Sequence, residues 1–106
     1  MFKGKWYIQE MSEWDAEYFN EEVQAFIEVK AGGQGEFQFG YVVGFMDGKI
    51  IDHPNGKRFE FTWDGNDEND PVNGFGWFQK KSIDQIEGEI RFHNGDDSTF
   101  VAVMAK

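Results

Sequence analysis

The fold of this chain is decided by the stretch Arg58-Phe59-Glu60-Phe61-Thr62-Trp63. Its three aromatic residues alternate with charged or hydroxyl residues, and successive side chains of a β-strand point to opposite faces. One face of this segment is therefore apolar and the other polar, which is typical of a strand that covers a core and also meets water. We predict a strand over residues 57–64.

The same period of two recurs on both sides of this stretch. Phe75 and Trp77, for example, share one face while Gly74 and Gly76 take the other. Strands are predicted at 5–11, 23–30, 36–46, 49–52, 57–64, 72–80, 86–93 and 98–105. The segments 36–46 and 49–52 are either two strands joined by a turn at Asp47-Gly48 or one long strand with a kink there.

Composition favours strands as well. The 106 residues include 12 Phe, 4 Trp, 3 Tyr and 13 Gly but no Leu, a strong helix former. This length fits one domain, residues 1–106.

The one segment without strand periodicity is 12–19, where Ser12 is a candidate helix N-cap and Trp14 and Tyr18 stand four residues apart. It predicts a helix of two or three turns, or an irregular equivalent, between the first two strands.

Local turns join nearly all of the predicted strands. Pro54-Asn55-Gly56 and Asn94-Gly95-Asp96-Asp97 are typical hairpin signals. Such connections produce a meander rather than a Greek key. The chain is therefore predicted to be all-β, a small antiparallel meander that closes into a barrel of seven or eight strands.

Several motifs resemble those of known proteins. The motif Gly4-Lys5-Trp6 resembles the opening of lipocalin and calycin-like barrels, a resemblance that implies a Trp6 plugging one barrel end. A wider series resembles an uncharacterised family of small bacterial proteins: it comprises Gly4-Lys5-Trp6, Gly35-Glu36-Phe37-Gln38-Phe39, Phe61-Thr62-Trp63-Asp64-Gly65-Asn66-Asp67-Glu68, Gly74-Phe75-Gly76-Trp77 and Phe92-His93-Asn94-Gly95-Asp96-Asp97-Ser98. This resemblance implies a shared fold and a bacterial source, and it carries no catalytic role.

The charge excludes several classes of partner. Ten Lys and Arg residues stand against twenty Asp and Glu residues, a formal net charge of −10, which argues against binding of nucleic acid or anionic lipid.

There is no cysteine for a disulfide or a thiolate site. No apolar run is long enough to span a membrane, and Met1-Phe2-Lys3-Gly4 does not begin a signal peptide. We expect a cytoplasmic protein without a cofactor.

The order of the strands predicts where the negative charge gathers. In an antiparallel meander, connections two strands apart lie at the same end, so the loops 64–71 and 94–97 are expected to be neighbours. If Asp47-Gly48 is a hairpin, segment 12–22 joins them and adds Glu13, Asp15, Glu17, Glu21 and Glu22. The candidate binding residues of this end are Asp64, Asp67, Glu68, Asp70, His93, Asp96 and Asp97.

Two chemical interpretations of this end compete with simple solvated turns. Asp64, Asp67, Glu68 and Asp70 are candidate ligands of a divalent cation, and their spacing resembles the start of an EF-hand loop. Asn69 and Phe75, however, stand where that loop needs Gly and Glu. A Ser-His-Asp set of His93, Asp96, Asp97 and Ser98 is disfavoured, because neighbours within one hairpin turn rarely converge. His53, beside Pro54, is expected to be an exposed loop histidine.

The aromatic faces leave two functions open. Trp6, Phe39, Phe61, Trp63, Trp77 and Phe92 line a possible pocket, or they form a packed core, since eight strands enclose little more than their own side chains. We expect a non-enzymatic interaction module whose acidic end binds a basic protein. The alternative is a carrier or enzyme that holds a small ligand in an apolar barrel pocket. The protein is expected to be a monomer or a weak homodimer.

Overall fold

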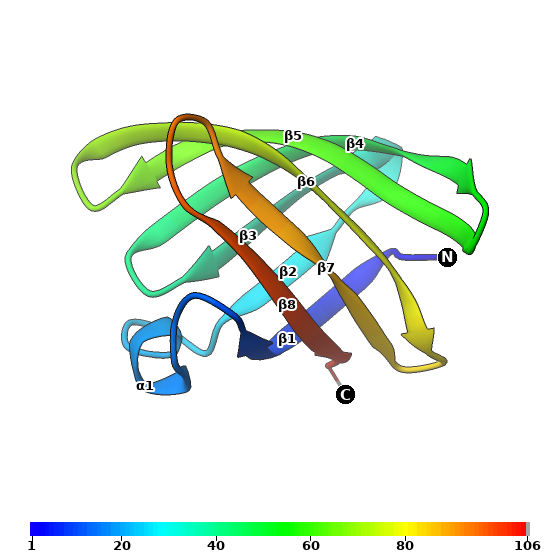
Figure 1. Ribbon diagram of the computed structural model, residues 1–106, viewed down its shortest axis with the longest axis horizontal. Coiled ribbons are helices and arrows are strands. Elements are labelled where there is room, and N and C mark those ends of the chain that lie inside the picture. Colours follow the sequence, from blue (N-terminus) through cyan, green and yellow to red (C-terminus); the bar gives the residue numbers. More distant parts are fainter. Residues whose placement is uncertain (106) are drawn as a thin grey trace.

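Eight antiparallel strands form a closed barrel in the computed structural model, which describes residues 1–105 (Figure 1). They are β1 (Gly4–Met11), β2 (Phe26–Val29), β3 (Gln34–Phe39), β4 (Val42–His53), β5 (Gly56–Asp67), β6 (Asp70–Ser82), β7 (Gln85–Phe92) and β8 (Asp97–Met104). Each strand pairs with the next, and β8 pairs with β1. The predicted all-β meander barrel is confirmed.

The alternation in β5 becomes the inside and the outside of the barrel. Phe59, Phe61 and Trp63 are buried, whereas Glu60 and Thr62 are exposed. Aromatic side chains from strands that are not neighbours meet across the interior; the ring centroids of Phe39 on β3 and Phe92 on β7, for instance, lie 6.3 Å apart. The barrel is therefore closed around an aromatic core.

The prediction of a turn or a kink at Asp47-Gly48 was wrong. The turn lies at Gly40-Tyr41, and Asp47 and Gly48 are inside β4, paired with Thr62 and Phe61 of β5. Gly40 has a φ of +55°, in the left-handed region that favours glycine. Gly48 has a different reason to be glycine: a Cβ there would lie 2.6 Å from the Phe59 ring. A glycine needed for packing thus resembled a turn signal.

Segment 12–19 is less helical than predicted. Helix α1 (Ala16–Phe19) is a single turn, and its N-cap is Asp15, whose carboxylate accepts a hydrogen bond from the Tyr18 amide. Ser12 instead prolongs the seam between β1 and β8, because its hydroxyl accepts a hydrogen bond from the Thr99 amide at 2.9 Å. The irregular alternative was closer to the structure.

A 3-10 turn, η1 (Ala31–Gly33), joins β2 to β3. Within residues 1–105, neither of these short helices has the length and apolarity to cross a membrane.

Two predicted boundaries also differ. The predicted loop 64–71 is mostly strand, because β5 and β6 continue to a tight turn at Glu68-Asn69. The predicted strand 23–30 shrinks to the four residues of β2, since the Asn20 side chain accepts a hydrogen bond from the Ala25 amide. The long β5–β6 hairpin therefore extends beyond the body of the barrel (Figure 1).

Candidate functional site

Four connections lie together at one end of the barrel. They are the β1–β2 segment with α1, the β3–β4 turn, the β5–β6 turn and the β7–β8 turn; the N-terminus and the end of β8 lie at the opposite end (Figure 1). We define the acidic end as residues 12–25, 40–41, 64–73 and 91–97. Because the barrel has eight strands, segment 12–22 belongs to this end, which was one of the two alternatives left open by the sequence.

The acidic end carries the whole net charge of the protein. Eleven of the twenty carboxylates are here, but only Arg91 among the ten Lys and Arg residues. Elsewhere in the chain nine acidic and nine basic side chains cancel. The eleven carboxylates belong to Glu13, Asp15, Glu17, Glu21, Glu22, Asp64, Asp67, Glu68, Asp70, Asp96 and Asp97.

Backbone hydrogen bonds join three of the four connections to one another. The Gly40 amide donates to the Phe19 carbonyl at 2.9 Å, which ties the β3–β4 turn to α1. The Glu68 amide donates to the Tyr41 carbonyl at 3.1 Å, which ties the β5–β6 turn to the β3–β4 turn. The carboxylates of this surface are therefore held on a connected scaffold rather than on separate loops.

Two tyrosines among these connections show the effect of the charge. The pKa of Tyr41 is raised above its ordinary value of 10.0, first by the negative charge of Glu21 and then by burial. The pKa of Tyr18 is also raised, first by burial and then by the charge of Asp67. The structure thus brings Glu21, from the segment before β2, and Asp67, at the end of β5, to one surface. The Tyr18 and Tyr41 rings meet edge to face at 6.5 Å.

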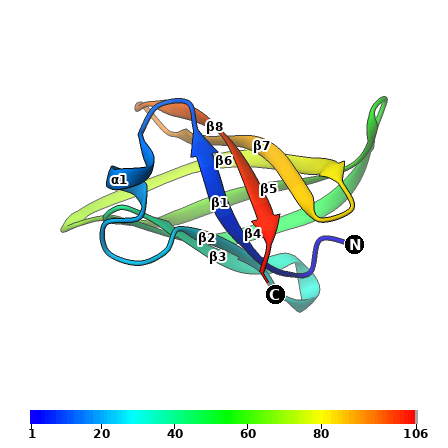
Figure 2. The same ribbon diagram turned by 90° about the horizontal axis from the view of Figure 1, so that it is seen from below.

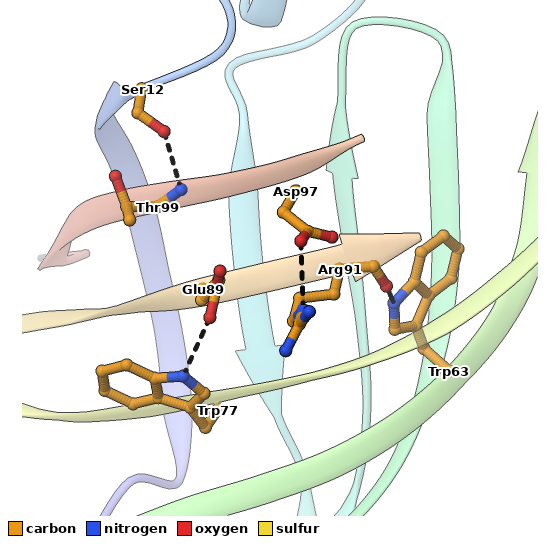
Figure 3. A network of polar contacts seen from close by, with 7 residues as sticks. All are labelled: Ser12, Trp63, Trp77, Glu89, Arg91, Asp97 and Thr99. Carbon is orange, nitrogen blue, oxygen red and sulfur yellow. Dashed lines mark hydrogen bonds and ion pairs between the residues drawn. The ribbon is translucent and has the colours of Figure 1, made fainter. Parts of the chain in front are cut away.

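The residues around the β7–β8 turn are held differently. Arg91 Nε lies 3.2 Å from Asp97 Oδ2, an ionic contact without hydrogen-bond geometry, and the Arg91 carbonyl accepts a hydrogen bond from Trp63 Nε1 (Figure 3). The His93 amide donates to the Asn73 carbonyl at 2.7 Å, which places the exposed His93 beside β6. Asp97 is thus partly neutralised, while Asp96 remains exposed in the turn.

The structure assembles no catalytic Ser-His-Asp set here. Ser98 is buried, and its hydroxyl donates to the Thr99 carbonyl and accepts from the Glu13 amide. The imidazole of His93 contacts the amide side chain of Asn94 at 3.3 Å instead. Ser98 therefore anchors segment 12–13 onto β8, which is a structural role.

The four candidate metal ligands do not converge either. Asp67 and Asp70 are paired across the hairpin, whereas Asp64 belongs to the other face of β5, because an odd number of positions separates it from Asp67. Among residues 1–105, no three His, Asp or Glu side chains are grouped to hold a metal ion.

The candidate pocket residues lie mostly in a filled interior. Trp6, Phe39, Phe61 and Trp63 are buried, and Phe92 packs edge to face on Trp63 at 5.0 Å. The prediction that Trp77 lines the interior was wrong, because its side chain lies on the outside of β6. There Trp77 Nε1 donates a hydrogen bond to Glu89 (Figure 3), and the Arg58 guanidinium stacks 3.8 Å from the Trp77 ring centroid. The inward face of β6 carries Phe78 and the glycines, because the Gly76 position abuts the Phe61 ring.

Sequence reasoning missed the aromatic part of the acidic end. Trp14 stacks on Tyr18 with ring centroids 6.0 Å apart and packs at a tilt against Phe39, with centroids 5.1 Å apart. Trp14 is only partly buried. Tyr41 is also partly buried. The sequence feature connected with this cluster is the glycine at position 40. A Cβ at this position would lie 2.7 Å from the Tyr18 ring, so glycine allows the ring to pack there.

No family model, curated protein or solved structure matches this chain. The resemblances to calycin-like barrels and to a bacterial family stay predictions.

Proposed function

We propose that the protein is a non-enzymatic interaction module whose acidic end binds a basic surface on another protein. One observation carries the proposal: the entire net charge lies on four segments at one end of the barrel. A surface of one sign steers an oppositely charged partner into contact and discourages other partners.

Exposed charge alone supplies little affinity, so the aromatic residues beside it matter. Interface hot spots are enriched in Trp, Tyr and Arg, which bury large areas at a small entropic cost. Trp14, Tyr18 and Tyr41 are partly buried and lie among the carboxylates. They would anchor a partner that the charge has attracted.

The backbone of Glu68 gives further support. Its φ of +54° lies in the left-handed region, where residues other than Gly and Asn carry a cost of roughly 1 kcal/mol. A carboxylate at the tip of the β5–β6 turn is therefore kept at the expense of stability, as is usual for groups that serve recognition.

The carrier alternative has less support. It needs a hollow barrel, whereas the interior is occupied by aromatic rings in contact, such as Phe37 and Trp63 at 5.0 Å. Eight strands leave room for these side chains and little else.

The proposal is tested with two variants of equal net charge. The first replaces Glu21, Glu22, Asp67 and Glu68 by their amides; the control replaces Glu10, Glu28, Glu60 and Glu87, which lie outside the acidic end, by glutamine. Binding to a lysine-rich peptide and to a panel of small basic proteins is measured by calorimetry at low and physiological salt.

We expect the first variant to lose at least tenfold in affinity, with the control close to the parent protein. Equal losses in both variants would show that only the net charge matters. Either this result or the absence of any binding by the parent protein would overturn the proposal.

A further inference from the structure

A pocket of about 390 Å³ lies at the barrel end opposite the acidic end. Its walls come from the start of the chain, the β2–β3 connection and β4, and Figure 2 shows the N-terminus on the same side of the barrel as that connection. We call it the basic pocket; it is lined by Met1, Phe2, Lys3, Val29, Lys30, Ala31, Gly32, Gly33, Gly48, Lys49, Ile50 and Phe59.

Glycine shapes the wall of the basic pocket. Gly32 and Gly33 have φ values of +77° and +80°, and a Cβ at Gly33 would lie 2.0 Å from the Gly48 carbonyl oxygen. The β2–β3 connection can therefore lie directly on β4. This close approach fixes one side of the pocket through backbone atoms.

The floor of the pocket is apolar and anchored in the core. Phe2 and Phe59 are buried with ring centroids 6.4 Å apart, and the Phe2 carbonyl accepts a hydrogen bond from Trp6 Nε1 at 3.0 Å. Ile50, on the wall, is 48 % exposed. An exposed isoleucine beside a preformed apolar floor is a surface that an apolar ligand would cover.

The rim of the pocket is basic. Lys3 and Lys30 line it, and no carboxylate does. Lys49 stands opposite Glu60 in the register and alternates with Ile50 along β4, so its side chain lies on the outer face of the strand, away from the apolar floor. Lys30 is paired with Glu36 at 3.3 Å, whereas Lys3 forms no ion pair within residues 1–105. The Lys3 ammonium beside an apolar floor is therefore available to an anion.

We propose that the basic pocket binds a small amphipathic carboxylate, with its apolar group on Phe2, Phe59 and Ile50 and its carboxylate on the Lys3 ammonium. The volume lies within the usual range for small-molecule sites. The net charge of −10 does not oppose this ligand, because it is concentrated at the far end of a molecule 35 Å long. Charges separated by more than about 8 Å of physiological solution are largely screened. The inference does not rest on the acidic end.

The experiment is a titration of the ¹⁵N-labelled protein, followed by amide chemical shifts, with octanoate and 3-phenylpropanoate as probes and octanamide as the neutral analogue. The two acids distinguish an alkyl from an aryl ligand. We expect saturable shifts at Phe2, Ala31–Gly33 and Ile50, with a dissociation constant on the order of 1 mM. Octanamide should bind at least threefold more weakly than octanoate.

Matched variants separate the rim from the floor. Lys3→Gln should weaken octanoate about threefold to tenfold, and Lys49→Gln, whose side chain lies on the outer face of β4, should not. Ile50→Ser should weaken it, and Ile83→Ser should not, because Ile83 is 89 % exposed in the β6–β7 turn.

Three results would overturn the proposal. The first is the lack of a saturable shift at the solubility limit of both acids. The second is equal binding of octanamide and octanoate, which would remove the role of Lys3. The third is a set of shifts centred on Phe39 and Trp63 inside the barrel or on the acidic end.

Discussion

The amide of Glu68 donates a hydrogen bond to the carbonyl of Tyr41, 3.1 Å away, and so joins the tips of two hairpins that are separated by the whole of β4 and β5. Glu68 reaches this position with a left-handed backbone. The same residue thus links two hairpin turns and presents a carboxylate at the tip of the acidic end.

Replacing Glu68 should therefore stabilise the protein. Asparagine tolerates the left-handed region better than glutamate, so Glu68→Asn should raise the free energy of unfolding by about 0.5–1 kcal/mol. Urea denaturation measures the change. Asp70→Asn is the control, because it removes the same charge from the same hairpin where φ is ordinary. Equal gains in both variants would assign the effect to charge repulsion rather than to the backbone.

The tyrosines should make stability depend on pH in alkaline solution. Their pKa values are higher in the folded protein than in the unfolded chain, so the folded state holds the phenolic protons more tightly. The contribution of these groups is complete below pH 10.0, their ordinary pKa, and is lost as the pH rises through the folded values. Denaturation across this range should show falling stability.

Glu21→Gln should lower the pKa of Tyr41, because the Glu21 charge is the main cause of its shift. Ultraviolet absorbance of the phenolate follows the titration. Glu10→Gln, outside the acidic end, should leave the curve unchanged. A curve that is identical for the parent protein and for Glu21→Gln would contradict the arrangement of Glu21 beside Tyr41.

The inside and the outside of the barrel should differ sharply in alanine variants. Phe61 is 4 % exposed in the core, so Phe61→Ala should cost about 3–5 kcal/mol of unfolding free energy. Trp77→Ala removes packing on Arg58 and a hydrogen bond to Glu89, both on the outer face, and should cost about 1–2 kcal/mol. Urea denaturation compares the two. A larger loss at Trp77 would contradict its placement on the outer face.

Position 44 should tolerate alanine only when the neighbouring Phe37 side chain is replaced by a smaller one. The nearest atoms to a Cβ at this position all belong to the Phe37 ring, at 2.3–2.9 Å. Gly44→Ala should therefore cost about 1–3 kcal/mol. Adding Phe37→Leu should recover part of this loss, and a double-mutant cycle measures the coupling. Strictly additive losses would show that the ring is not the obstacle.

The barrel could be predicted from the sequence because apolar and polar side chains alternate in strands such as Phe59–Trp63, where one face is buried and the other is exposed to solvent. Sequence reasoning misplaced the turn because Asp47-Gly48 has the composition of a turn, while the reason for Gly48 is the Phe59 ring across the sheet. It placed Trp77 inside because aromatic residues usually face the core. Here two glycines face inward: a Cβ at Gly76 would lie 2.6 Å from the Phe61 ring, and one at Gly74 would lie 3.0 Å from Trp63 Nε1.

The candidate site was predictable in outline and not in detail. Strand order alone placed the loops around Asp67 and Asp96 at one end. It did not reveal that Tyr18 and Tyr41 lie beside Glu21 and Asp67, because that contact depends on Gly40. The basic pocket left no local signal, since Phe2, Lys30 and Ile50 come from three distant segments.

Closure of the barrel through β1 and β8 leaves the sheet with no free edge from which strands could fray. We therefore expect the closed sheet to open locally at its shortest strand, β2. This strand has four residues and lies between β1 with eight residues and β3 with six. Amide hydrogens of Ile27 and Val29 should exchange with solvent before those of the twelve-residue strands β4 and β5. Since β2 runs from the acidic end to the basic pocket, a ligand at either end would slow exchange along the strand that connects them.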